Sequence, residues 1–171
     1  MELTREAHLE PAQRHLSDRH VYAPVEVFAA MTALEDPESV QASLAASRRG
    51  QDGTTWRVVW LSEAHVTFCE AMRPDHSGWS LELGQAVGQV APVVNGWTVP
   101  LSSMSALAVT DVRAGRSGFG EGVTADVVWS VSVTGGRGFT VPLFGEFTHA
   151  SVADDVEGFV AALRSAWASS D

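Results

Sequence analysis

Apolar and polar residues alternate along much of the chain between Trp97 and Leu143, and this alternation constrains the fold more than any other feature. In the clearest stretch the apolar side chains occupy every second position, at Val127, Trp129, Val131 and Val133. Because successive side chains of a strand point to opposite sheet faces, this spacing predicts a strand with one buried face. A turn over 134–138 leads to a second alternating run over 139–143, so the two segments predict a β-hairpin.

Further extended segments are expected before this hairpin. A turn at Gln51–Gly53 precedes two runs rich in Val, Thr and Trp, which predict a first hairpin. The Asn95-Gly96 dipeptide predicts a tight turn, because both residues tolerate a positive φ. The full set of predicted strands covers 54–61, 65–71, 79–83, 87–94, 97–102, 105–112, 127–133 and 139–143, with a glycine-rich loop over 114–122.

Three helices are predicted. The last has the best-defined boundaries, because Ser151 precedes an acidic first turn as in a capping box. Its apolar residues fall on one face, at Val152, Val156, Phe159, Val160, Leu163 and Trp167, and we expect Trp129, Val131 and Val133 to meet that face. Pro24 predicts a helix over 24–34, and Asp36-Pro37 predicts another over 37–48 with a thin apolar stripe.

The 171 residues suffice for one domain with an appendage. With 45% hydrophobic and 19% charged residues the composition is that of a folded globular protein. We predict a polar N-terminal segment over 1–22 that forms a loose helix or is disordered, a helical extension over 23–50, and a β domain with its C-terminal helix over 51–171.

Charge and cysteine content narrow the functional classes. The net charge is −10, and the 11 basic residues are all scattered arginines, so nucleic acid and anionic membranes are disfavoured as partners. The single cysteine, Cys69, rules out an intramolecular disulfide and a Cys-rich metal site. Without an apolar run of signal-peptide length near the N-terminus, the chain is predicted to be cytoplasmic.

No motif for catalysis, metal binding or phosphate binding stands out, so we predict no catalytic, metal-binding or cofactor-binding residues. The loop around Gly118-Phe119-Gly120 precedes a strand, whereas a dinucleotide fingerprint precedes a helix. His8, His15 and His20 lack zinc spacing and are expected to be solvated, and Cys69 is expected to be a buried thiol. An enzyme would require His65 to meet Glu70 or Asp126 in a pocket.

The six tryptophans have two interpretations. They are Trp56, Trp60, Trp79, Trp97, Trp129 and Trp167. Large aromatic side chains most often build a core, and Trp129 and Trp167 fit the sheet face and helix stripe that should meet. The alternative is that they line a cavity for a small apolar ligand.

The C-terminal two-thirds resembles the bacterial pleckstrin-homology-like domains, including the related GRAM type. The resemblance lies in WRVVWLSEAHVTF as a first hairpin, WTVPLSSMSALAV as a later strand pair, WSVSVTGGRGFTVPLF as a last hairpin and DDVEGFVAALRSAW as a closing helix. It implies an α+β, mainly β fold, in which about seven antiparallel strands form a partly open barrel capped by the C-terminal helix, here with added N-terminal helices.

Members of that family commonly bind phosphoinositides, peptides or proteins. The lipid-binding members use Lys and Arg around the first hairpin loop, which here reads Ser62-Glu63-Ala64-His65 and contains neither. The resemblance therefore favours a non-enzymatic interaction module that binds an unidentified protein partner or assembles as a homo-oligomer. A small apolar ligand inside a barrel is the alternative, and an enzyme is the third hypothesis.

Overall fold

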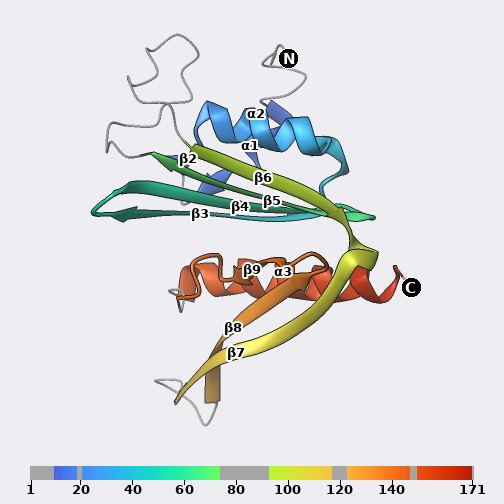
Figure 1. Cartoon of the computed structure of the whole chain (residues 1–171). Coiled ribbons are helices and arrows are strands. Elements are labelled where there is room, and N and C mark those ends of the chain that lie inside the picture. The colour runs from blue at the N-terminus through green and yellow to red at the C-terminus, as the bar shows by residue number, and fades with distance from the viewer. Residues whose placement is uncertain (1–9, 19–20, 74–92, 117–122, 147–149, 171) are drawn as a thin grey trace. The chain divides into compact units, whose positions relative to one another are not determined.

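The computed structural model describes residues 10–18, 21–73, 93–116, 123–146 and 150–170 (Figure 1). Contacts divide the chain into two compact units, unit 1 (Met1–Leu101) and unit 2 (Ser102–Asp171). The two larger sheets are antiparallel, have four and three strands, and are not closed. With short N-terminal helices and one C-terminal helix, this arrangement confirms the predicted mainly β class.

The sheet of unit 1 has the order β3-β4-β5-β6, and all its neighbouring strands are antiparallel. Its strands are β3 (Ala42–Gly50), β4 (Gly53–Leu61), β5 (His65–Arg73) and β6 (Val93–Pro100). The turn at Gln51–Gly53 is confirmed, and Gly53 has a φ of 128°, which a side chain would disfavour. The hairpin of β4 and β5 is also confirmed, with Ser62 N–H donating to the His65 carbonyl at 3.0 Å.

The predicted helix over 37–48 is wrong. Asp36 caps a single 3₁₀ turn, η2 (Pro37–Ser39), by accepting from the Glu38 N–H at 3.0 Å. The chain then becomes β3, which pairs with β4 along its whole length. The local start signal was correct, but a thin apolar stripe gives a helix little to bury, and pairing with a central strand outweighs helix propensity. The predicted helical extension over 23–50 is therefore helical only as far as Ser39.

The N-terminal segment also differs from expectation where it is described. It forms α1 (Glu10–Gln13) and then β1 (Ser17–Asp18), which pairs with β2 (Val21–Tyr22). Ala12 and Leu16, four positions apart, are fully buried. These two side chains add the segment to the core of unit 1, while Glu10 and Arg14 stay exposed.

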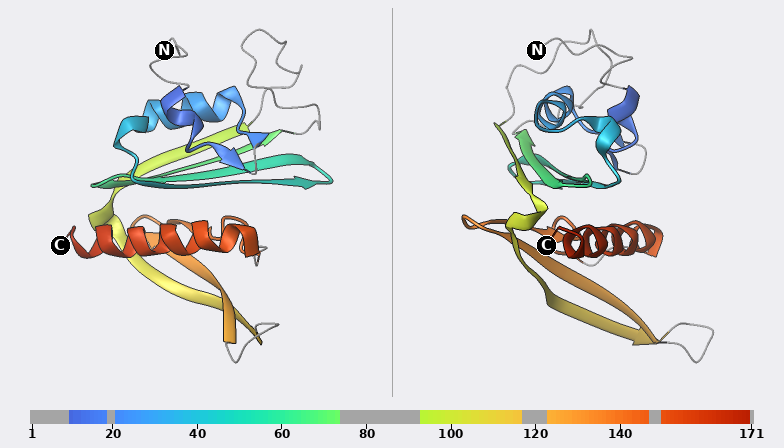
Figure 2. Two further views of the ribbon diagram at one scale, coloured as in Figure 1. Left: turned by 180° about the vertical axis from the view of Figure 1, so that it is seen from behind. Right: turned by 90° about the vertical axis from the view of Figure 1, so that its right-hand side faces the viewer.

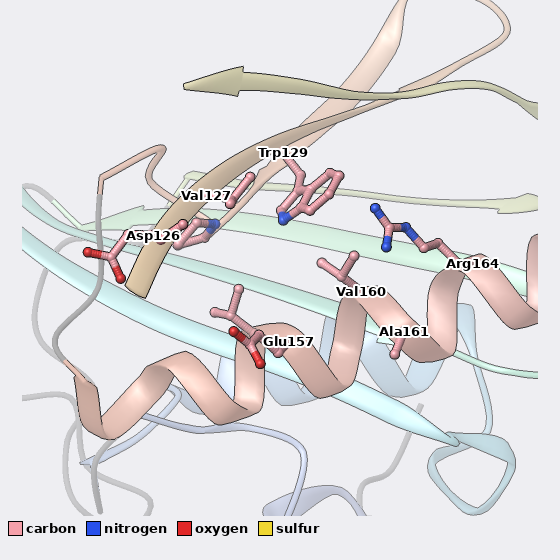
Figure 3. Close-up of a pocket in the computed structure, with 10 residues that line it drawn as sticks. Asp126, Val127, Trp129, Glu157, Val160, Ala161 and Arg164 are labelled. Atoms are coloured by element: carbon pink, nitrogen blue, oxygen red, sulfur yellow. The ribbon is translucent and has the colours of Figure 1, made fainter. Parts of the chain in front are cut away.

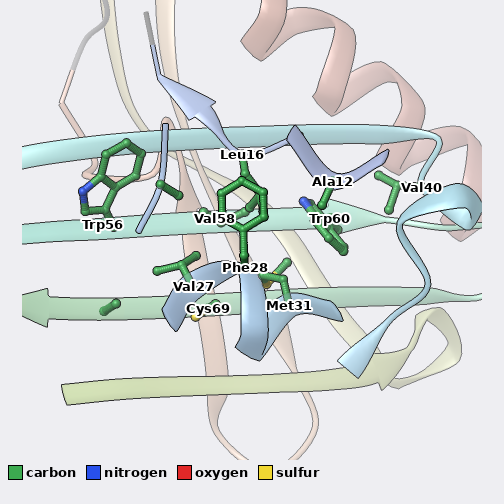
Figure 4. Close-up of a cluster of buried hydrophobic side chains, with 12 residues drawn as sticks. Ala12, Leu16, Val27, Phe28, Met31, Val40, Trp56, Val58, Trp60 and Cys69 are labelled. Carbon is green, nitrogen blue, oxygen red and sulfur yellow. The ribbon is translucent and has the colours of Figure 1, made fainter. Parts of the chain in front are cut away.

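The helix α2 (Val25–Leu34) confirms the prediction over 24–34 and lies over the sheet of unit 1 (Figure 2). Val27, Phe28 and Met31 recur at helical spacing on one face of α2, and all three side chains are fully buried. They pack into a cluster with strand residues that include Trp56, Val58, Trp60, Cys69 and Ala71 (Figure 4). The core of unit 1 is therefore a helix-on-sheet layer.

Asn95-Gly96 is not a turn. Both residues lie within β6, opposite Glu70 and Cys69. A Cβ at Gly96 would lie 3.0 Å from Leu34 Cδ1, so the glycine lets the end of α2 approach the strand closely. The predicted strands over 79–83 and most of 87–94 lie outside the described residues.

The sheet of unit 2 has the order β7-β8-β9, with β7 (Met104–Arg116), β8 (Val123–Val133) and β9 (Arg137–Val141). The predicted last hairpin is confirmed, and Gly135 and Gly136 in its turn have φ values of 88° and 77°. β7 is longer than predicted and takes in the start of the expected 114–122 loop, whose residues 117–122 lie outside the described part.

The closing helix is α3 (Ala150–Ala168). Val156, Phe159, Val160 and Leu163 are buried as the stripe predicts, while Trp167 is partly exposed. The helix begins one residue before Ser151, so Ser151 lies inside the first turn and does not precede it. Within unit 2, α3 lies beside β9 and the near part of β7 and β8, whose far ends extend away from the helix (Figures 1 and 2).

Candidate binding groove

The histidines do not form a metal site among the residues that the structure describes, where no group of three or more potential ligands occurs. His15 is not solvated as expected. Its Nδ1 lies 3.0 Å from Ser43 Oγ, and its ring meets Trp60 edge-on at 6.0 Å between centroids. His65 is exposed at the start of β5, and His8, His20 and His76 lie outside the described residues.

Cys69 is buried in the core of unit 1. Burial, with a smaller contribution from the Glu70 carboxylate, raises the pKa of its thiol to about 12. A thiol with that pKa is almost wholly protonated at neutral pH, and the thiolate is the nucleophilic form. Cys69 is therefore a structural thiol, as predicted.

The pairing of His65 with Glu70, one of the two on which an enzyme hypothesis depended, is not formed. His65 and Glu70 are five positions apart on β5, so strand alternation puts them on opposite faces of the sheet. Glu70 instead accepts from Arg57 Nε at 2.6 Å across the β4–β5 pair. Asp126 lies on β8 opposite Arg113.

The tryptophans divide between core and pocket. Trp56 and Trp60 are fully buried in unit 1, and Trp97 packs against Phe68 with ring centroids 5.5 Å apart. Trp79 lies outside the described residues. Trp129 is partly exposed and lines a pocket in unit 2, and no other tryptophan among the described residues lines that pocket.

This Trp129 pocket lies between β8 and α3 and has a volume of about 310 Å³. Its sheet side consists of Ala125, Val127 and Trp129, which share one face of β8 by alternation, and of Pro142 after β9. Its helix side includes Val156, Val160 and Ala161, at the spacing of one helix face. Seven of the ten lining residues are thus apolar, and most of them come from the same periodic patterns that predict the two elements.

Three charged residues also line the pocket. Figure 3 shows Asp126 and Glu157 toward one end and Arg164 beside Trp129 toward the other. The Arg164 guanidinium carbon lies over the Trp129 ring, 4.4 Å from its centroid, which is cation–π geometry. Among the residues that the structure describes, Arg164 forms no ion pair.

The apolar face of the pocket continues onto β7, an edge strand of its sheet. Val109 lies opposite Trp129, and Val112 lies opposite Val127. Facing residues on paired antiparallel strands point to the same side of the sheet, so both valines share the face of Trp129. They are 50% and 54% exposed, and we call this pair the valine strip.

A β-bulge makes the valine strip possible. The register shifts by one residue between Val109 and Asp111, and Thr110 is the extra residue. In a regular strand, positions 109 and 112 would point to opposite faces, because their spacing is odd. The bulge therefore brings both valines to the pocket side. The sequence pattern indicates neither the bulge nor the pocket. The alternation of Val127 and Trp129 predicts only that these two side chains share one face of the sheet.

No family model, curated protein or solved structure matches the chain. The resemblance to the pleckstrin-homology-like domains stays a prediction. Among the residues that the structure describes, no helix combines the length and apolar character needed to cross a bilayer.

Proposed function

We propose that this chain is a non-enzymatic interaction module that binds a partner protein through the Trp129 pocket and the valine strip of unit 2. The observation that carries the proposal is the continuity of these two surfaces. A pocket of about 310 Å³, lined by seven apolar and three charged residues, borders two valines that are each at least half exposed. Exposed apolar surface next to a pocket is typical of protein interaction sites.

The residue types support the same proposal. Trp and Arg are the side chains most enriched among residues that dominate binding energy, and here Trp129 and Arg164 stack on each other. The valine strip lies on an edge strand, where a partner segment has room to approach. A resemblance to domains that bind peptides and proteins fits this function.

A photo-crosslinking amino acid placed at position 112 of the full chain tests the proposal. The matched control carries the same amino acid at Gln51, which is exposed in the β3–β4 turn. We expect position 112 to crosslink a partner in cells and the control to miss it. A product of twice the chain's mass would identify the partner as a second copy. Identical products at both positions, or none at 112, would contradict the proposal.

A small apolar ligand is the second candidate, and the pocket volume favours it. A volume of about 310 Å³ lies at the lower end of the range for small-molecule sites. This candidate places the ligand at Trp129 between β8 and α3, and gives no role to the valine strip. Replacing Val112 with Asp should then leave ligand binding unchanged, whereas it should abolish binding of a protein partner.

A further inference from the structure

Arg164 is the unusual residue of the Trp129 pocket. It is the one cation among the ten described residues that line the pocket, it is exposed, and it lies on a chain whose net charge is −10. Its guanidinium covers the Trp129 ring face, and among the described residues it has no carboxylate partner. A guanidinium that lies over a ring can keep its in-plane N–H donors directed away from the ring. Arg164 is thus placed to bind an anion at the edge of the apolar surface.

A carboxylate is the anion that best fits these donors. Arginine binds carboxylates through two parallel N–H···O bonds, which are stronger than hydrogen bonds between neutral groups. Because Arg164 lies directly on Trp129, the carboxylate must be attached close to the apolar group that enters the pocket. A long polar linker between the two groups would not fit this distance.

Glu157 fixes the direction in which such a ligand can bind. It precedes Arg164 by seven residues on α3 and lines the same pocket. Seven residues correspond to about 10 Å along a helix axis, so the two charges lie two turns apart on one face. A carboxylate is attracted to the Arg164 end and repelled from the Glu157 end.

We infer that the Trp129 pocket binds the C-terminal residue of a partner chain, with an apolar side chain in the pocket and the terminal carboxylate on Arg164. This inference rests on the proposed function. An apolar C-terminal residue carries its side chain and its carboxylate on one carbon atom, as the closeness of Trp129 and Arg164 requires. The valine strip favours a peptide over a small acid, because it offers further apolar surface to the residues that precede the C-terminus.

The test compares two peptides that differ only in this charge, acetyl-Gly-Gly-Leu with a free carboxylate and the same peptide as its C-terminal amide. Binding to the full chain is followed by the NMR signal of the Trp129 indole N–H and by the dissociation constant. We expect the acid to bind about fivefold or more tightly than the amide. In Arg164→Gln the two peptides should bind equally, and Arg164→Lys should retain part of the preference, because it keeps the charge without the planar donors.

Two variants control for charge. Arg49→Gln removes an equal charge from an exposed position on β3, outside the pocket, and should leave the preference unchanged. Glu157→Gln removes the repulsion inside the pocket and should strengthen binding of the acid without weakening that of the amide. Thermal unfolding of each variant confirms that these exposed substitutions leave the fold intact.

Each outcome decides a separate point. Equal affinities for acid and amide, with a shift at Trp129, would overturn the inference and leave the proposed function standing. No shift at Trp129 with either peptide, together with no crosslink at position 112, would overturn both. Octanoate tests whether the ligand is a small carboxylic acid. If octanoate binds and its binding requires Arg164, while neither peptide binds, the occupant is a small carboxylate and the inference of a C-terminal residue is wrong.

Discussion

The indole Nε1 of Trp60 donates a hydrogen bond to the backbone carbonyl oxygen of His15 at 3.2 Å. The two residues are 45 positions apart, and the bond ties the N-terminal segment to the second strand of the unit 1 sheet. Ala23 N–H, which follows β2, donates to the neighbouring Leu16 carbonyl at 2.8 Å. The segment that begins at Glu10 is thereby part of the folded core.

Replacing Leu16 with Ala should therefore destabilise the protein as a core substitution does. Leu16 is fully buried, and deleting such a side chain costs about 2–5 kcal/mol through lost transfer free energy and a residual cavity. Urea unfolding measures the change in the free energy of unfolding. Gln41→Ala, at an exposed position, is the control and should change it by less than about 0.5 kcal/mol. Equal effects would show that the N-terminal segment is not packed.

The stability of unit 1 should fall as the solution becomes acidic. Partial burial and the neighbouring Arg14 lower the pKa of His15, while Glu38 opposes them. The unfolded chain then binds more protons than the folded one between the folded pKa and about 6.5, so stability is lost as pH falls through this interval. Protonation would also oppose the bond that Arg14 Nε donates to His15 Nε2 at 3.0 Å.

His15→Gln should reduce this pH dependence. Urea midpoints of the wild-type chain and the variant, compared between about pH 7.5 and pH 5, give the measurement. The groups that face His15 remain in the variant, namely Arg14, Glu38, Ser43 and Trp60. The same slope in both proteins would mean that His15 does not carry the effect.

Two glycines of unit 2 should respond in opposite ways to the same substitution. A Cβ at Gly138 would lie 2.5 Å from the Val131 carbonyl oxygen, a backbone atom that can move little, so Gly138→Ala should cost about 1–3 kcal/mol. Gly158 lies in α3 with open space around its Cα, so Gly158→Ala should stabilise by about 1 kcal/mol. Thermal unfolding of both variants checks the pair, and a gain at Gly138 would contradict the packing of β9 on β8.

Cys69 should resist thiol reagents while the protein is folded. Its buried thiol has a pKa of about 12, so almost no thiolate forms at pH 8. With 5,5′-dithiobis(2-nitrobenzoate) we expect reaction only at the rate of unfolding, and complete reaction in denaturant. Rapid reaction of the native chain would show that the α2 layer does not cover β5.

Where the predictions failed, the deciding interaction lay outside the local segment. Asp36-Pro37 gives a genuine start signal, yet the segment that follows becomes β3 because it pairs with β4. Asn95-Gly96 has the composition of a turn, but the glycine serves a close approach by Leu34, some 60 positions earlier in the sequence. A local pattern contains no information about either partner.

The elements with strong periodicity could be predicted from the sequence. The period of two in Val127–Val133 produced β8, the three- and four-residue spacing of Val156, Phe159, Val160 and Leu163 produced the buried stripe of α3, and Gly135-Gly136 produced the turn into β9. Which face of such a segment is apolar depends only on the segment's own residues, so it can be predicted from the spacing of the apolar side chains alone.

The places where those faces leave a surface open depend on how the elements pack, and sequence periodicity does not show them. The Trp129 pocket requires β8 and α3 to be brought together, and the stacking of Arg164 on Trp129 joins residues 35 positions apart. The valine strip depends on a one-residue register shift at Thr110, which reverses the face of every later side chain on β7. Strand register and the close approach of two elements depend on contacts between separate segments of the chain. Those contacts determine where the Trp129 pocket and the valine strip lie.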